Sequence, residues 1–125
     1  MGAIVKITCA SCKSTWQCRK GCGIQHGQFE NVKILFPLDI QYELENYEAK
    51  TRFPFFDFGF QLSICEHCKS VESIPVIQLP ENQEVFTGVC QGCGQKTELI
   101  GSLEKTRCPV CGEYSLSEED MGVWD

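Results

Sequence analysis

This 125-residue chain contains four Cys-x-x-Cys pairs: Cys9/Cys12, Cys65/Cys68, Cys90/Cys93 and Cys108/Cys111. A two-residue gap lets both sulfurs face one tetrahedral metal ion. Four such pairs supply eight thiolates, which is enough for two four-cysteine sites. A short chain needs such staples, because it buries too little apolar surface to fold firmly by burial alone. The pattern predicts a small metal-bound protein in which these eight cysteines are the metal ligands.

The ten cysteines of the chain could in principle form disulfides instead of metal sites. The N-terminal residues run directly into the first pair without a long apolar stretch, which argues against a secretory signal. No segment approaches the roughly 18 apolar residues of a membrane helix. We therefore expect a cytoplasmic protein that does not enter membranes. Thiols stay reduced in that compartment, so the cysteines are expected to bind metal.

The chain is acidic, with 17 acidic and 11 basic residues and a formal charge of −6. Eight thiolates and two Zn²⁺ ions would add four more negative charges. Nucleic-acid binders usually present a basic face, because phosphate contacts dominate their affinity. The charge balance makes nucleic acid an unlikely partner.

Alternation of apolar and polar residues predicts a mainly β fold. Residues 3–9 form one expected strand, with Val5, Ile7 and Cys9 on one face. The clearest alternation covers residues 56–64, where three phenylalanines, a leucine and an isoleucine share the inward face. A further strand is expected over residues 74–79, where Pro75 indicates an edge position.

An insert over residues 23–55 interrupts these strands, and its local structure is ambiguous from sequence. Residues 38–44 alternate as a strand would, whereas Ile40, Leu44 and Tyr47 fit one stripe of a helix. We favour a helix over about 39–50, with Asp39 as a possible N-cap, because the glutamates, alanine and lysine there suit a helix.

The polar stretch at residues 80–84 is the best candidate linker. It divides the chain into a first zinc ribbon, residues 1–80, which carries the insert, and a second zinc ribbon, residues 81–125. Sequential pairing then places Cys9, Cys12, Cys65 and Cys68 in one site, and Cys90, Cys93, Cys108 and Cys111 in the other. The crossed alternative joins Cys65/Cys68 to Cys90/Cys93. We favour sequential pairing because a 14-residue gap suits a single hairpin.

The residue after each second cysteine is informative. Gly94 and Gly112 follow two of the pairs, where the turn often needs a positive φ that glycine adopts easily. Lys13 and Lys69 occupy the equivalent positions in the other two pairs. Their ammonium groups could offset the negative charge of a thiolate cage.

Cys18 and Cys22 remain outside the four pairs. They could replace an expected pair of zinc ligands or form a disulfide, but we favour two spare thiols of hydrophobic character. Of the two histidines, His67 is expected to be a solvated turn residue, and His26 lies in a glycine-containing turn and could ligate only if a cysteine were missing.

No catalytic constellation of Cys, His, Asp or Ser is discernible, and a four-cysteine cage leaves no open position for water. We therefore expect no enzyme activity. The phenylalanines at 56, 58 and 60 are expected to pack in the core, because no basic residues are interleaved with them as in single-strand binders. Phe53 and Phe55 could be exposed. Trp124 is expected to fold back onto the second ribbon.

The strand-entered knuckles, above all Cys108-Pro109-Val110-Cys111-Gly112, resemble the zinc-ribbon and rubredoxin-like knuckle superfamily. The whole layout, including Gly21, Gly23 and the tail Gly122–Asp125, resembles small uncharacterised bacterial proteins with two zinc ribbons. The two knuckle lysines depart from the usual glycine. The resemblance implies cytosolic zinc-binding proteins of unassigned function.

These features together predict two zinc ribbons that bind two Zn²⁺ ions, and a structural or adaptor protein that contacts another protein. Two alternatives stay open. One is a nucleic-acid-associated accessory protein, as many ribbons are. The other is a rubredoxin-like electron-transfer protein, because four thiolates suit iron as well as zinc.

Overall fold

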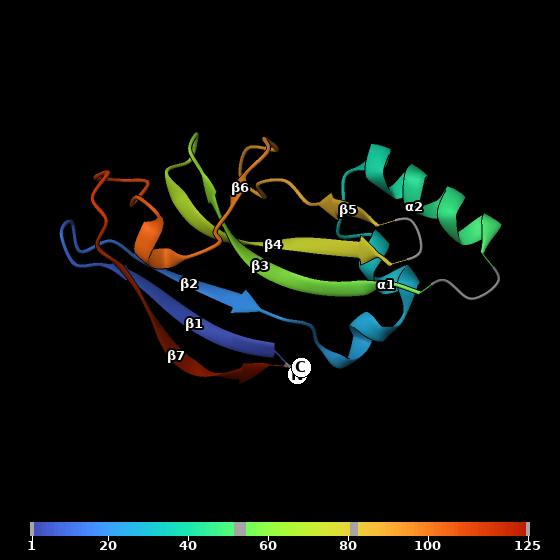
Figure 1. Cartoon of the computed structure of the whole chain (residues 1–125), viewed down its shortest axis with the longest axis horizontal. Helices are drawn as coiled ribbons and strands as arrows, with labels where there is room; N and C mark the ends of the chain where they lie inside the picture. The colour runs from blue at the N-terminus through green and yellow to red at the C-terminus, as the bar shows by residue number, and fades with distance from the viewer. Residues whose placement is uncertain (1, 52–54, 81–82, 125) are drawn as a thin grey trace.

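The computed structural model describes residues 2–51, 55–80 and 83–124, which fold into two antiparallel sheets and a short helical insert (Figure 1). The first sheet has the order β2-β1-β7, and the second has the order β5-β4-β3-β6. The strands are β1 (Gly2–Cys9), β2 (Thr15–Lys20), β3 (Asp57–Cys65), β4 (Ser70–Leu79), β5 (Glu84–Thr87), β6 (Glu98–Leu99) and β7 (Leu116–Trp124). The mainly β fold predicted from the sequence is confirmed.

The three-stranded sheet joins the two ends of the chain. β1 pairs with β2 from Ala3↔Lys20 to Thr8↔Thr15. On its other edge β1 pairs with β7, from the N-terminal end of β1 to Cys9↔Leu116. The expected strand at residues 3–9 is confirmed. The C-terminal tail does fold back, but it joins β1 and not a second ribbon.

The four-stranded sheet is built on the β3–β4 hairpin, which is in register from Asp57↔Gln78 to Cys65↔Ser70. The strand expected over residues 56–64 is therefore confirmed. The edge position predicted for Pro75 is wrong, because β4 lies between β3 and β5. Pro75 is tolerated there because it lies just outside the β4–β5 ladder, which begins at Val76↔Thr87. No residue of β5 therefore needs a hydrogen bond from the proline nitrogen, which carries no hydrogen.

The two sheets are held together by a shared hydrophobic core and one backbone bridge. Gly21, just after β2, exchanges hydrogen bonds with Phe60 of β3, at 3.0 and 2.7 Å. The core residues come from both sheets and include two of the pair cysteines: Val5, Ile7, Cys9, Cys18, Leu62, Val71, Cys108 and Leu116. Two of the ligand candidates are thus part of the core.

The insert is helical and covers the end of the four-stranded sheet that lies away from the cysteine turns (Figure 1). A 3₁₀ turn (Ile24–Gly27) leads to α1 (Phe29–Lys33) and α2 (Leu38–Lys50). The helix expected at 39–50 and its stripe of Ile40, Leu44 and Tyr47 are confirmed, since these residues pack with Ile77 and Leu79. The N-cap is Pro37, and Asp39 lies in the first turn.

Strand pairing does not follow the expected division at residue 80. β5 and β6 complete the sheet begun by β3 and β4, whereas β7 completes the sheet begun by β1 and β2. The proposed linker connects β4 to β5, which are neighbouring antiparallel strands. Residues 81–82 of that stretch, and Phe53 of the phenylalanine cluster, lie outside the described residues. Within the described ranges no helix has the length and apolar character needed to cross a membrane.

Candidate metal centres

Each Cys-x-x-Cys pair forms a knuckle turn, and the residue after its second cysteine has a positive φ. The angle is 66° at Lys13, 54° at Lys69, 75° at Gly94 and 80° at Gly112. The turn predicted from the glycines is therefore shared by all four pairs, and two lysines adopt a conformation that costs a residue with a Cβ about 1–2 kcal/mol.

Three knuckles share the same backbone hydrogen bonds. The amides of Lys13, Gly94 and Gly112 each donate to the carbonyl of the first cysteine of their pair, at 2.9 Å. The amides of Cys68, Gly92 and Val110 point at a cysteine sulfur, at 3.4, 3.3 and 3.4 Å. Such N–H groups stabilise a thiolate, so these turns are shaped to hold negative sulfur.

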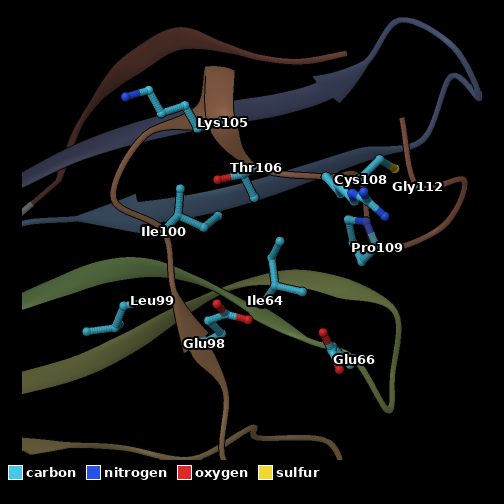
Figure 2. Close-up of a pocket in the computed structure, with 11 residues that line it drawn as sticks. Ile64, Glu66, Glu98, Leu99, Ile100, Lys105, Thr106, Cys108, Pro109 and Gly112 are labelled. Atoms are coloured by element: carbon cyan, nitrogen blue, oxygen red, sulfur yellow. The ribbon is translucent and has the colours of Figure 1, made fainter. Parts of the chain in front are cut away.

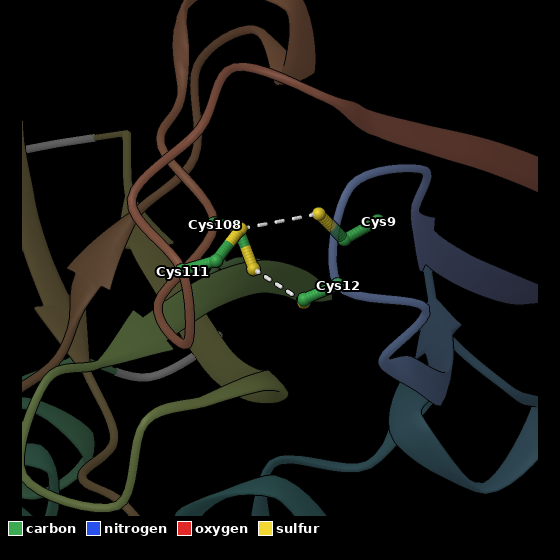
Figure 3. A group of neighbouring side chains, drawn as sticks. All are labelled: Cys9, Cys12, Cys108 and Cys111. Atoms are coloured by element: carbon green, nitrogen blue, oxygen red, sulfur yellow. Dashed lines mark hydrogen bonds between the residues drawn. The ribbon is translucent and has the colours of Figure 1, made fainter.

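The eight cysteines gather into two groups of four. Cys9 and Cys12 meet Cys108 and Cys111 in what we name the terminal cluster, because it joins the two ends of the chain (Figure 3). Cys65 and Cys68 meet Cys90 and Cys93 in the central cluster. The sequential pairing is wrong and the crossed arrangement is correct. The cause is strand pairing: β7 returns to β1, which carries Cys108 and Cys111 to the tip of the β1–β2 hairpin.

Sulfur–sulfur distances test whether the clusters suit a metal ion. In the terminal cluster Cys9 Sγ lies 3.6 Å from Cys111 Sγ, and Cys12 Sγ lies 3.7 Å from Cys108 Sγ. In the central cluster the equivalent distances are 3.5 Å for Cys65–Cys93 and 3.7 Å for Cys68–Cys90. A tetrahedral ion with Zn–S bonds of about 2.3 Å sets its sulfurs about 3.8 Å apart. Both clusters fit such an ion, and all ten cysteines are free thiols.

Three serine hydroxyl groups lie near the terminal cluster, and one of them contacts a cysteine sulfur. The Cys12 thiol donates to Ser14 Oγ at 3.3 Å, and Ser11 and Ser115 are hydrogen-bonded to each other at 2.8 Å beside the cluster. Hydrogen bonding with the side chain and backbone of Ser14 lowers the pKa of Cys12 to about 6. The lowered pKa favours the thiolate form that a metal requires.

The central cluster instead has a carboxylate beside it. The Cys90 thiol donates to Glu72 Oε1 at 3.2 Å. Burial, and then the Glu72 carboxylate, raise the pKa of Cys90 well above its usual range. The other carboxylate oxygen, Oε2, is buried and has no hydrogen-bond partner. The sequence did not point to Glu72 or Ser14, because the knuckle pattern marks ligands but not the side chains that touch them.

The two surplus cysteines belong to neither cluster. Cys18 is buried in the core, where its thiol donates to the Val71 carbonyl at 3.6 Å. The interpretation of Cys18 as a small hydrophobic residue is supported. Cys22 is half-buried at the end of β2.

The two histidines differ sharply. His67 is exposed in the Cys65–Cys68 turn, as expected. His26 is 7% exposed, and its ring lies 4.7 Å from Phe58 and 5.6 Å from Trp124. Its Nδ1 accepts a hydrogen bond from the Gly23 amide at 2.8 Å. His26 lies in the 3₁₀ turn Ile24–Gly27, in agreement with the predicted turn, but its ring is buried against aromatic residues of β3 and β7 that no local pattern reveals.

A groove of about 460 Å³ lies between the two clusters (Figure 2). Ile64, Glu66 and Glu98 line it on the side of the four-stranded sheet, and Thr106, Cys108 and Pro109 line it on the other. Lys105 and Arg107 also border it, so its rim carries both signs of charge. Residues from the knuckles of both the terminal and the central cluster line the groove.

The chain matches no protein-family model, no curated protein and no solved structure. Its two four-cysteine groups fit sites of the zinc-ribbon type by geometry.

Proposed function

We propose that this protein binds two Zn²⁺ ions, one in each cluster, and that the ions are structural. The observation that supports this most directly is the sulfur spacing of 3.5–3.7 Å in both clusters. A closed cage of four thiolates is the usual structural zinc site, whereas catalytic zinc keeps a position for water. When bound, zinc would neutralise part of the thiolate charge and tie the paired knuckles together. On this basis we assign the protein no catalytic role.

We further propose that the zinc-loaded protein is an adaptor that binds an extended segment of another protein in the groove between the clusters. The lining of the groove is apolar at Ile64, Ile100 and Pro109, and both carboxylates and cations border it. Such a rim suits a partner segment with charges of both signs. One wall includes Glu66 of a central-cluster knuckle and the other includes Cys108 and Pro109 of the terminal cluster, so we expect the groove to be deformed when either cluster is lost.

Metal analysis of protein purified without chelator, with its absorbance spectrum, tests the first proposal. Two zinc ions per chain and no visible bands are expected. Iron with charge-transfer bands would replace the proposal with electron transfer, since a four-sulfur site accepts either metal. A chain that binds neither metal would refute it.

Affinity capture from extracts of the source cells tests the adaptor role. The zinc-loaded wild type is compared with Glu98→Lys and Arg107→Glu, which reverse charge on the groove rim. Glu43→Lys is the matched control, because Glu43 is exposed on α2 and outside the groove. One protein should be retained by the wild type and the control but lost with both rim variants. Retention of a nuclease-sensitive complex instead would favour the nucleic-acid alternative.

A further inference from the structure

We propose that the two clusters hold metal with unequal strength, and that Glu72 makes the central cluster the weaker, exchangeable site. This inference rests on the proposed function, since it assumes that both clusters bind zinc. It assigns to Glu72 a role in setting metal affinity, and to the central cluster a role as the metal-responsive part of the protein.

The first step of the argument is the contact between Glu72 and Cys90. Glu72 Oε1 lies 3.2 Å from Cys90 Sγ, so a carboxylate oxygen touches a candidate ligand sulfur. Zinc would be held by Cys90 as a thiolate. A carboxylate only accepts hydrogen bonds, so Glu72 has none to donate to that thiolate. The contact would therefore set two anions against each other when zinc is bound.

The second step is that Glu72 is fixed in place. It lies on β4, between β3 and β5, directly opposite Ser63 of β3. The Ser63 side chain is fully buried, and Ser63 Oγ and Glu72 Oε2 both lack hydrogen-bond partners. Because Oε2 is buried although Glu72 as a whole is half-buried, water screens the repulsion between Glu72 and the thiolate less than it would at an exposed site.

The third step is the contrast with the terminal cluster. There the residue in contact with a ligand sulfur is Ser14, whose hydroxyl lies 3.3 Å from Cys12 Sγ. A hydroxyl accepts from a thiol and, after rotation, donates to a thiolate. Ser14 can therefore donate a hydrogen bond to a zinc-bound thiolate, whereas Glu72 cannot.

Loss of metal from the central cluster would have a local consequence. The second knuckle of that cluster is tied to the four-stranded sheet through β5 on its N-terminal side and through β6 on its C-terminal side. β6 pairs with β3 at two positions, Ser63↔Leu99 and Ile64↔Glu98. These residues adjoin or form one wall of the groove in Figure 2. Release of the weaker ion would loosen that wall while the terminal cluster keeps the chain ends together.

Competition with a chromophoric zinc chelator, followed in the zinc-loaded full chain, tests the proposal. Two phases of one zinc each are expected. The departing site is identified in amide NMR spectra after one equivalent has left: the signals of Cys68 and Gly92, whose amides face central sulfurs, should shift, and that of Val110 should not. Glu72→Gln, whose amide can donate to a thiolate, should tighten the weaker phase at least about tenfold, or 1.4 kcal/mol.

Glu43→Gln is the matched control, because it removes the same charge from an exposed position on α2, outside both clusters. It should change the weaker phase much less than Glu72→Gln does. The proposal would be overturned by any of three results: release of both ions in one phase, earlier loss of zinc from the terminal cluster, which contains Val110, or equal effects of the two variants. These results would leave two zinc sites intact, whereas a chain that binds no zinc would refute the proposed function itself.

Discussion

The terminal and central clusters use the same knuckles but occupy different places in the fold. Each combines one lysine knuckle from a hairpin tip with one glycine knuckle from a later loop. Cys9 and Cys108 of the terminal cluster pack in the hydrophobic core that the two sheets share. Cys65 and Cys90 of the central cluster are equally buried, but they lie outside both groups of packed core residues. Both clusters therefore contain buried cysteines, and only the terminal cluster is continuous with the shared core.

Loop length makes only a small difference to the stability of the two clusters. The chain between the two knuckles is roughly fourfold longer for the terminal cluster, so closing it costs only about 1.3 kcal/mol more in loop-closure entropy. Packing is the larger effect, because removing a well-packed core side chain costs about 2–5 kcal/mol. We therefore expect the two clusters to contribute unequally to stability, because only the terminal cluster is continuous with the shared core.

The largest expected effect comes from removing each cluster in turn. Cys111→Ser should leave one zinc and unfold most of the three-stranded sheet, because structural zinc contributes on the order of 10 kcal/mol to small domains. Cys93→Ser should also leave one zinc but disturb only the segment around β6. Circular dichroism melting with zinc analysis measures both. Equal loss of structure in the two variants would contradict the comparison.

A second test weakens the pairing of β7 with β1 without changing any cysteine. Trp124 Nε1 donates to the Lys20 carbonyl at 3.2 Å, and the Arg19 guanidinium lies 4.9 Å from the indole ring. Trp124→Ala should cost about 2 kcal/mol in unfolding free energy, since the ring is only half-buried. Chemical denaturation provides the measurement. Val123→Ala, at an exposed neighbour, should stay within about 0.5 kcal/mol.

The lysine knuckles allow a smaller test in both clusters. Lys13→Gly and Lys69→Gly should each raise unfolding free energy by about 1 kcal/mol, because both lysines have positive φ. Denaturation of the zinc-loaded variants measures this. Lys13→Asn is the control, because asparagine tolerates positive φ but carries no charge. If Lys13→Gly and Lys13→Asn both destabilise, the ammonium group matters more than the backbone strain.

The smallest expected effect is a pH dependence of stability that arises from a histidine outside the two clusters. Burial, and then the nearby Arg19 charge, lower the pKa of His26. The unfolded chain takes up a proton near pH 6.5 that the folded chain accepts only at lower pH. The stability held by neutral His26 is therefore complete above about pH 6.5 and is lost as pH falls through the folded-state pKa.

Melting temperatures of wild type and His26→Gln between pH 7.5 and 5.5 measure this contribution. The advantage of the wild type should shrink as pH falls, with both proteins kept zinc-loaded. His67→Gln, at the exposed histidine, is the matched substitution, and the effect of His26→Gln should exceed it. A constant difference between wild type and His26→Gln would contradict the assignment.

Spacing and periodicity in the sequence were enough to predict the knuckles and the strands that end at Cys9 and Cys65. The residue composition of the insert favoured the helix found at Leu38–Lys50 over the alternative of a strand. These features depend on residues within a few positions of one another, so a linear pattern records them. The positive φ after each second cysteine was likewise visible at Gly94 and Gly112.

The tertiary structure alone decided which knuckles meet. All four turns are nearly identical, so nothing within a knuckle specifies its partner. The choice was made by strand pairing over long distances, when β7 joined β1 and β6 joined β3. The same long-range packing buried His26, placed Pro75 inside a sheet and set Glu72 against Cys90. Such contacts depend on complementarity between surfaces far apart in the chain, which no local spacing encodes.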